Sequence, residues 1–150
     1  MALDQNISEL HKLHTASQDK YTYFLLAASG ASIGFAVQKT EGLPLSWWLI
    51  SVGLAVVCWA LSFWFGLRAV DRAQGILMAN FDYLQLQQGS HPQQPGHPQL
   101  VGAAKQGVRQ AMDRLSKESG SASAWQLRML LAGAVFFIIW RVLEMYRVTG

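Results

Sequence analysis

Two charged residues near the C-terminus have the spacing most suggestive of chemistry. Arg141 and Glu144 lie three positions apart in a largely apolar segment. On a helix this spacing places the guanidinium beside the carboxylate. A charge at membrane depth is costly and usually faces a bundle interior or a water-filled path. Two interpretations follow: a surface ion pair continued by Arg147, or a ring of Arg141 side chains that lines an oligomeric pore and favours anions.

The remaining reactive side chains predict no catalysis. His11 and His14 are one helical turn apart, but no further ligand stands near them, which favours a solvated or packed pair over a metal site. The single cysteine, Cys58, can form neither an intrachain disulfide nor a metal cluster, and we interpret it as a packing residue. No nucleophile and base pair, phosphate-binding loop or zinc spacing occurs. We therefore expect no enzyme activity, no metal and no cofactor.

The elements that must position these residues are long uncharged segments. Tyr21–Gln38 and Gly42–Leu67 contain no charged side chain and are separated only by Lys39-Thr40-Glu41. A helix crosses the hydrocarbon core of a bilayer with roughly 20 mostly apolar residues. The pair therefore predicts a transmembrane hairpin. Pro44 suits the first turn of its second helix, because its missing N–H has no partner there in any case.

The rest of the chain completes an all-α membrane protein with three transmembrane helices and cytoplasmic helical extensions. The predicted segments are a cytoplasmic amphipathic N-terminal helix (1–20), transmembrane helix 1 (21–38), transmembrane helix 2 (44–67), a cytoplasmic helical hairpin (68–124) with a Pro-rich loop (88–99), transmembrane helix 3 (125–146) and a periplasmic tail (147–150).

The distribution of basic residues predicts the orientation. Of the 12 Lys and Arg residues, only Lys39, Arg141 and Arg147 fall outside if the N-terminus is cytoplasmic, which leaves nine inside. This asymmetry satisfies the positive-inside rule, and the reverse orientation would invert it. The formal net charge of +3 is thus interpreted as a topology signal. No aromatic-interleaved basic cluster indicates nucleic-acid binding.

Small residues mark two helix surfaces for close packing. In lipid, small residues at four-residue spacing let helix backbones approach closely. The packing residues are Ala27, Gly30, Ala31 and Gly34 in the first span, and Cys58, Ser62 and Gly66 in the second. For the first-span face two interpretations remain open: packing within one chain, or self-association between chains.

Two further apolar stripes follow in polar surroundings, on either side of the Pro-rich loop. Both have helical periodicity. Their residues predict a face for a cytoplasmic partner: Leu77, Asn80, Leu84, Val101, Val108 and Leu115. A single Asn at a seam position can set register and oligomer state.

Three stretches carry a resemblance. They are Asp19–Leu26 at the start of the first span, His91-Pro92 through His97-Pro98 in the loop, and Trp140 with Val142–Tyr146 near the end. Over most of its length the chain is similar to small uncharacterised three-span proteins of the bacterial inner membrane. Its layout also resembles small membrane effectors of bacterial defence systems, in which helical cytoplasmic parts control a pore. The resemblance implies a bacterial inner-membrane location and no specific activity.

These features predict a small homo-oligomeric membrane protein, a channel or pore-type effector gated through its cytoplasmic helices. The alternative is a non-conducting anchor or scaffold that recruits a protein through the cytoplasmic hairpin. The expected partners are the lipid bilayer, further copies of the chain, and a cytoplasmic protein or small ligand.

Overall fold

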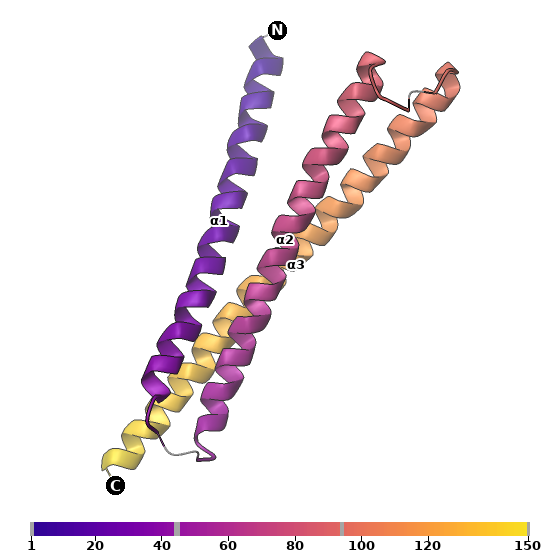
Figure 1. Cartoon of the computed structure of the whole chain (residues 1–150). Coiled ribbons are helices and arrows are strands. Elements are labelled where there is room, and N and C mark those ends of the chain that lie inside the picture. The colour runs from indigo at the N-terminus through magenta and orange to yellow at the C-terminus, as the bar shows by residue number, and fades with distance from the viewer. Residues whose placement is uncertain (1, 44–45, 94, 150) are drawn as a thin grey trace. The chain divides into compact units, whose positions relative to one another are not determined.

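The computed structural model describes residues 2–43, 46–93 and 95–149, with the backbone alone for residues 2–16, 18, 19, 148 and 149. All regular structure in these ranges is helical, in the order α1 (Ala2–Thr40), α2 (Leu49–Gln88) and α3 (Pro98–Thr149) (Figure 1). The predicted all-α class is confirmed. The predicted helix start at Pro44 and the side chains of His11 and His14 lie outside the described part of the chain.

Each helix is longer than a membrane crossing requires. The three helices have 39, 40 and 52 residues, whereas roughly 20 suffice to cross the hydrocarbon core. The predicted N-terminal helix and first span are one unbroken helix, α1. Likewise α3 contains both the amphipathic stripe that begins near Val101 and the third apolar segment, with no break between them.

The helices end at residues whose backbone preferences favour a stop. Gly42 and Gly89 have φ values of 78° and 73°, a left-handed conformation that glycine adopts without steric cost. After Gly89, the Ser90 N–H donates to the carbonyl of Gln85 at 3.0 Å, the bond that closes a Schellman motif. The N–H groups of Leu100 and Val101 both donate to the His97 carbonyl, which starts α3 immediately after the Pro-rich loop.

Two helices, Leu49–Gln88 and Pro98–Arg147, are long and apolar enough to cross a membrane. The predicted transmembrane helix 1, residues 21–38 of α1, is not among the described helices that meet this criterion. Three hydroxyl residues and two glycines lower its hydropathy: Thr22, Ser29, Ser32, Gly30 and Gly34.

The chain divides into two compact units that share α2 and α3. A three-helix unit contains Met1–Leu67 and Ser123–Gly150, and a two-helix unit contains Arg68–Ala122. The core of the three-helix unit is a cluster of buried residues from all three helices: Ala36, Val52, Ala55, Trp59 and Trp140. The Phe137 ring lies 5.3 to 5.8 Å from the rings of Phe35, Trp59 and Trp140, so that aromatic contacts join α1, α2 and α3.

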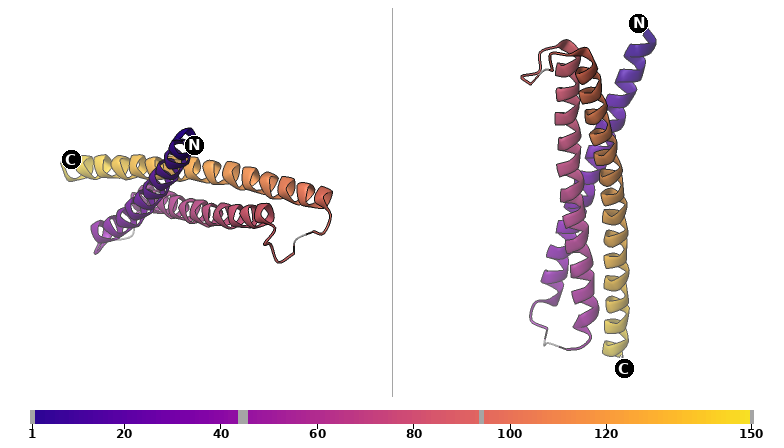
Figure 2. Two further views of the ribbon diagram at one scale, coloured as in Figure 1. Left: turned by 90° about the horizontal axis from the view of Figure 1, so that it is seen from above. Right: turned by 90° about the vertical axis from the view of Figure 1, so that its right-hand side faces the viewer.

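In the two-helix unit, α2 and α3 lie side by side and antiparallel (Figure 2). Ser119 donates to the carbonyl of Ala69 at 3.3 Å. Glu118 pairs with Arg72 across the two helices at 3.1 Å and with Arg114 on its own helix at 3.0 Å. The hydrogen bond from Arg114 lowers the pKa of Glu118 below its ordinary value; partial desolvation opposes this shift, and the charges of Arg72 and Arg114 reinforce it.

The ion pairs of Glu118 make the stability of the two-helix unit depend on pH. A carboxylate whose folded-state pKa is lowered stabilises the fold above its unfolded pKa, and the contribution disappears as the pH falls through the folded-state value. We expect Glu118→Gln to accelerate amide hydrogen exchange of this unit a few-fold at pH 7, because an exposed pair contributes modestly. At acid pH the two proteins should exchange equally. Asp113→Asn, an exposed carboxylate on the same helix, serves as the control, and equal protection of wild type and Glu118→Gln at pH 7 would contradict the prediction.

Candidate functional site

Side-chain donors join α2 to backbone carbonyls of α3 along the three-helix unit. Ser51, Trp59 and Ser62 all lie on α2 and all donate across the same contact. Their acceptors are the carbonyls of Phe136 at 2.9 Å, Leu130 at 3.2 Å and Gln126 at 2.8 Å, respectively. In a membrane such interhelical bonds contribute about 0.6 kcal/mol each on average. Their larger effect is to fix the register of the two helices, because each donor matches one carbonyl.

Ser29 connects α1 to this contact. Its hydroxyl lies 2.8 Å from the Leu25 carbonyl and 3.0 Å from the Ser62 hydroxyl, and both serines are fully buried. Each hydroxyl has one proton. Two protons must therefore serve three contacts: Ser29 to Leu25, Ser29 to Ser62, and Ser62 to Gln126. One contact lacks its proton in every arrangement, so three hydrogen-bond patterns are possible without moving a heavy atom.

Gln126 is the most unusual residue of this site. Its side chain is fully buried, and neither Nε2 nor Oε1 has a hydrogen-bond partner among the described residues. An unsatisfied buried polar group costs about 1–3 kcal/mol. Burial of this carboxamide therefore opposes the contact between the three helices.

Glycines create the space that this site occupies. A methyl group at Gly66 would collide with Gln126 Nε2, and would lie 2.7 Å from Leu26 Cδ2 and 2.9 Å from Gln126 Cδ. At Gly133 it would lie 2.5 Å from Trp59 Nε1 and 3.0 Å from the Ala55 carbonyl. A side chain at Gly66 would have to displace the Gln126 and Leu26 side chains, and one at Gly133 would press on the Trp59 ring and the Ala55 backbone.

The predicted small-residue surfaces have different environments. In α2, Ser62 and Gly66 are buried and Cys58 is half-buried. In α1, all four predicted packing residues are exposed: Ala27, Gly30, Ala31 and Gly34. A methyl group added at Gly30 or Gly34 would meet nothing within 4 Å. The side of α1 that packs against the chain's own helices instead presents Leu25, Ser29 and Ala36.

The charged residues of the third apolar segment have partners toward its ends. Arg141 donates to Glu144 at 3.0 Å, and its side chain is 59% exposed. The Arg128 guanidinium lies 5.3 Å from the centre of the Trp125 ring. One partner is three positions after its arginine and the other three before, so both guanidinium groups are held away from the middle of the segment.

The predicted partner face of the two-helix unit divides into two environments. Leu77, Asn80 and Leu84 on α2 are exposed. The predicted α3 residues are half-buried: Val101, Val108 and Leu115. Leu115 packs near Gly75, where an added methyl group would lie 3.4 Å from its Cδ1 atom. Only the α2 half of the predicted face is therefore fully open.

Sequence reasoning did not single out Ser29, Gln126 or Gly133 as site residues. A signal for the first two was present, because each is a polar residue within an apolar segment, and such residues in membrane helices usually bond across helices. Gly133 had no such signal, since its role depends on which face of α3 meets Trp59. Within the described residues, no three His, Cys, Asp or Glu side chains are close enough to hold a metal ion.

The contact between Gly66 and Gln126 can be tested by a double-mutant cycle. Gly66→Ala should lower the free energy of unfolding by about 1–3 kcal/mol, a typical cost of overpacking. In a Gln126→Ala background the loss should shrink by at least about 1 kcal/mol, because the main colliding side chain is gone. The measurement is denaturation of the protein in detergent micelles, followed by helical circular dichroism. Gly53→Ala, which meets nothing within 4 Å, should show no coupling to Gln126→Ala; equal coupling at both glycines would contradict the assignment.

Comparisons with known proteins provide no functional assignment, so the functional argument rests on this geometry. No family model, no curated protein and no solved structure matches the chain.

Proposed function

We propose that this chain is a three-span homo-oligomeric protein of the bacterial inner membrane, and that it acts as a channel or pore-type effector gated through its cytoplasmic helices. The observation that carries the proposal is the exposed small-residue face of α1. Membrane insertion, assembly and conduction each have separate support, and each can be tested separately.

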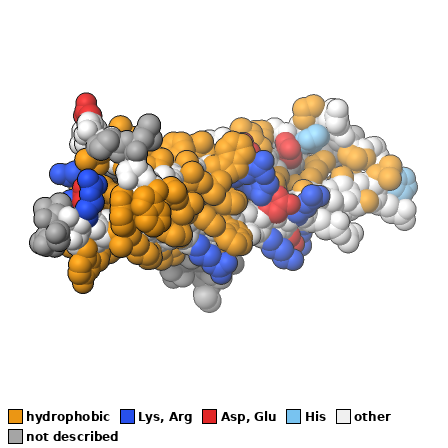
Figure 3. Space-filling view, turned by 90° about the horizontal axis from the view of Figure 1, so that it is seen from below, with side chains coloured by type: hydrophobic (Ala, Val, Ile, Leu, Met, Phe, Trp, Pro, Cys, Tyr) orange, Lys and Arg blue, Asp and Glu red, His pale blue; other side chains and the backbone are white. Residues whose placement is uncertain are grey.

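Insertion is supported by the apolar surface of the three-helix unit. Only 28% and 11% of the most apolar windows of α2 and α3 are buried, although the core helix of a soluble protein would be mostly covered. Large exposed side chains include Phe24 at 69%, Trp47 at 70% and Ile138 at 60%. Figure 3 shows hydrophobic side chains gathered over one face of the molecule. Soluble monomers rarely expose apolar patches larger than a few hundred Å².

Aromatic side chains support a bilayer of ordinary thickness. Trp47 and Trp48 lie in the turn just before α2, with tilted rings whose centres are 4.7 Å apart. The first charged residue beyond them on α2 is Arg68, about 30 Å further along a helix. This distance matches the hydrocarbon core. We assign residues 21–38 of α1 as the first span because α1 packs in the same unit, and by the positive-inside rule we assign the N-terminus to the cytoplasm and the C-terminus to the periplasm.

Assembly is supported by the exposure of the small-residue face of α1. Gly30 and Gly34 form a GxxxG pattern that none of the described residues covers. In lipid, exposed small residues at this spacing let another helix approach closely and gain van der Waals contacts. A second copy of α1 offers the same surface, which suits a symmetric contact.

Conduction is the most specific part of the proposal. Arg141 is exposed and lies within the third span, where a ring of guanidinium groups would favour anions. The α2 and α3 helices extend beyond the membrane without a break, so that a signal received by the two-helix unit reaches the spans through continuous helix.

Leucine substitutions on the α1 face should abolish assembly and leave the fold intact. Gly30→Leu and Gly34→Leu each add a side chain in space that is open within the chain, so helical content should be unchanged. Close approach of a second α1 would be blocked, and association should weaken by at least about tenfold. The measurement is the oligomeric mass of the purified protein in detergent by light scattering.

Gly53→Leu is the matched control, because Gly53 is also exposed, on α2, with open space around it. An unchanged oligomeric mass for both α1 variants would refute assembly through this face.

Conduction predicts anion flux in liposomes that contain the purified oligomer. Arg141→Gln removes the charge and should shift selectivity away from anions by roughly tenfold, the equivalent of about 1.4 kcal/mol. The control is Lys117→Gln, an exposed basic residue of the two-helix unit that lies outside the predicted spans. Unchanged conductance and selectivity in Arg141→Gln would rule out a role for Arg141 in a pore.

An exposed apolar stripe favours the alternative, a non-conducting anchor that recruits a protein partner. Leu77, Phe81 and Leu84 on α2 of the two-helix unit are 62%, 58% and 45% exposed. Their spacing places them on one helix face. A monomer without flux supports the anchor, whereas an oligomer with flux supports the channel.

A further inference from the structure

We propose a phospholipid-binding site at the end of the three-helix unit where α1 connects to α2, specific for lipids with an anionic headgroup. It rests on the proposed insertion into a membrane. The inference rests on two adjacent hollows, one apolar and one charged. Together they match the acyl chain and the charged headgroup of a lipid.

The apolar hollow is an open groove of about 360 Å³ between the start of α2 and the C-terminal part of α3. Its apolar walls are Trp47 and Trp48 from the turn before α2, Ile50 and Leu54 from α2, and Phe136, Ile139 and Leu143 from α3. Ser51 also lines it, but the Ser51 hydroxyl already donates to the Phe136 carbonyl at 2.9 Å. The lining therefore offers an occupant apolar contacts only. At the helical rise per residue, the segment from Trp47 to Leu54 extends over about 10 Å. This length is most of the hydrocarbon depth of one leaflet.

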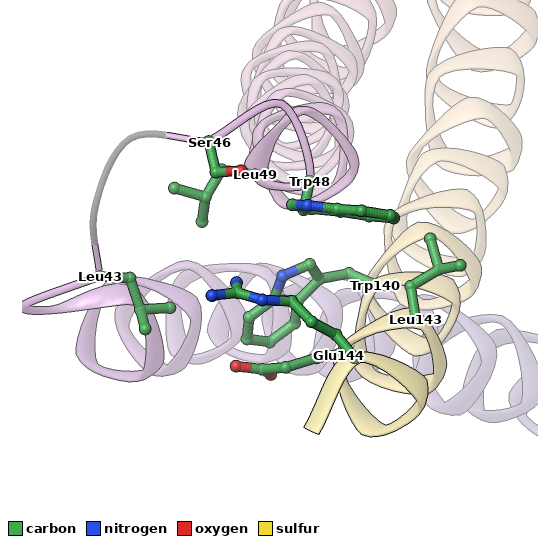
Figure 4. Close-up of a pocket in the computed structure, with 8 residues that line it drawn as sticks. Leu43, Ser46, Trp48, Leu49, Trp140, Leu143 and Glu144 are labelled. Carbon is green, nitrogen blue, oxygen red and sulfur yellow. The ribbon is translucent and has the colours of Figure 1, made fainter. Parts of the chain in front are cut away.

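The charged hollow shares Trp48 and Leu143 with the groove. It is small, about 30 Å³, with room for one water-sized group. Trp140 projects into it from α3, and Trp48, Leu43 and Ser46 border it from the connection between α1 and α2 (Figure 4). Arg147 and Glu144 complete its lining.

The charge of this hollow selects the occupant. The Glu144 carboxylate is paired with Arg141 at 3.0 Å. No ion pair joins Arg147 to another residue in the described part of the chain, so its guanidinium is the uncompensated charge of the site. Arginine binds phosphate oxygens through charge-assisted hydrogen bonds, and the Ser46 hydroxyl adds a second donor. A headgroup phosphate at the mouth of this hollow would place an acyl chain in the adjoining groove.

The test is native mass spectrometry of the full-length protein with added lipids. Wild type should retain phosphatidylglycerol about tenfold more tightly than phosphatidylcholine, because both carry the phosphate that Arg147 binds but the choline headgroup adds a cation that the guanidinium repels. Arg147→Gln should reduce this preference to about twofold or less. Glycerol phosphate, which has the headgroup chemistry without acyl chains, should not compete. An unchanged preference in Arg147→Gln, or competition by glycerol phosphate, would overturn the proposal.

The groove is tested by filling it. Ile139→Trp and Leu54→Trp each enlarge an exposed lining residue and should weaken retention of both lipids by about tenfold or more. Leu131→Trp, at an exposed position of α3 that does not line the groove, should retain them normally. Unaltered retention in both groove variants, at wild-type circular dichroism, would overturn the proposal.

Failure of membrane insertion is distinguishable from failure of the lipid site. Carbonate washing of membranes releases peripheral proteins and retains integral ones. A released chain would refute insertion, and the lipid site with it. A retained chain without a preference for phosphatidylglycerol would refute the lipid site alone.

Discussion

The contact between α2 and α3 is the constraint on which the rest of the structure depends. It is held by side chains that donate to main-chain carbonyls rather than to other side chains, as with Trp59 and Leu130 or Ser62 and Gln126. Such bonds need the two backbones to be close, and closeness needs Gly66 and Gly133. Hydrophobicity alone would hold two helices together in water, but in lipid it provides no net attraction between them. In the proposed membrane setting, directed bonds and small residues therefore specify the register. The helix α1 joins this contact through Ser29, whose hydroxyl lies within hydrogen-bond distance of the Ser62 hydroxyl.

Sequence reasoning identified the helices well and their faces less well. Long uncharged segments and breaker residues such as Gly89 are local signals, and the all-helical architecture follows from them. The side of α1 that meets α2 is not a local property. Both Gly30 and Ser29 lie in the same run of small residues, and periodicity cannot decide which of them faces inward. The same holds in the two-helix unit, where Ala69 and Leu86 are buried while Leu77 and Leu84, from the expected stripe, are exposed. Which stripe becomes buried depends on the partner helix, and a single sequence does not reveal the partner.

Two arginines illustrate how a short apolar segment tolerates charge. Spacing alone left Arg141 with two interpretations, and its ion pair with Glu144 is compatible with either, since a paired guanidinium can still face water. The contact of Arg128 with Trp125 has a simpler explanation. In the proposed orientation both residues lie near the membrane–water interface, where aromatic side chains are enriched and an arginine can pack against them. The functional assignment thus depends on assembly, and assembly is the property that a single chain reveals least.

The glycines of this chain fall into two groups with different evolutionary meaning. At Gly66 and Gly133 a side chain would collide with atoms of the same molecule, so natural variants should favour glycine whatever the protein assembles with. At Gly30 and Gly34 the molecule itself forbids nothing, and alanine would even favour the helix. If glycine persists at these two positions among natural variants, the restriction must come from a neighbouring chain. Sequence variation at two outward-facing residues of α1 would then report an interface that no single-chain structure can contain.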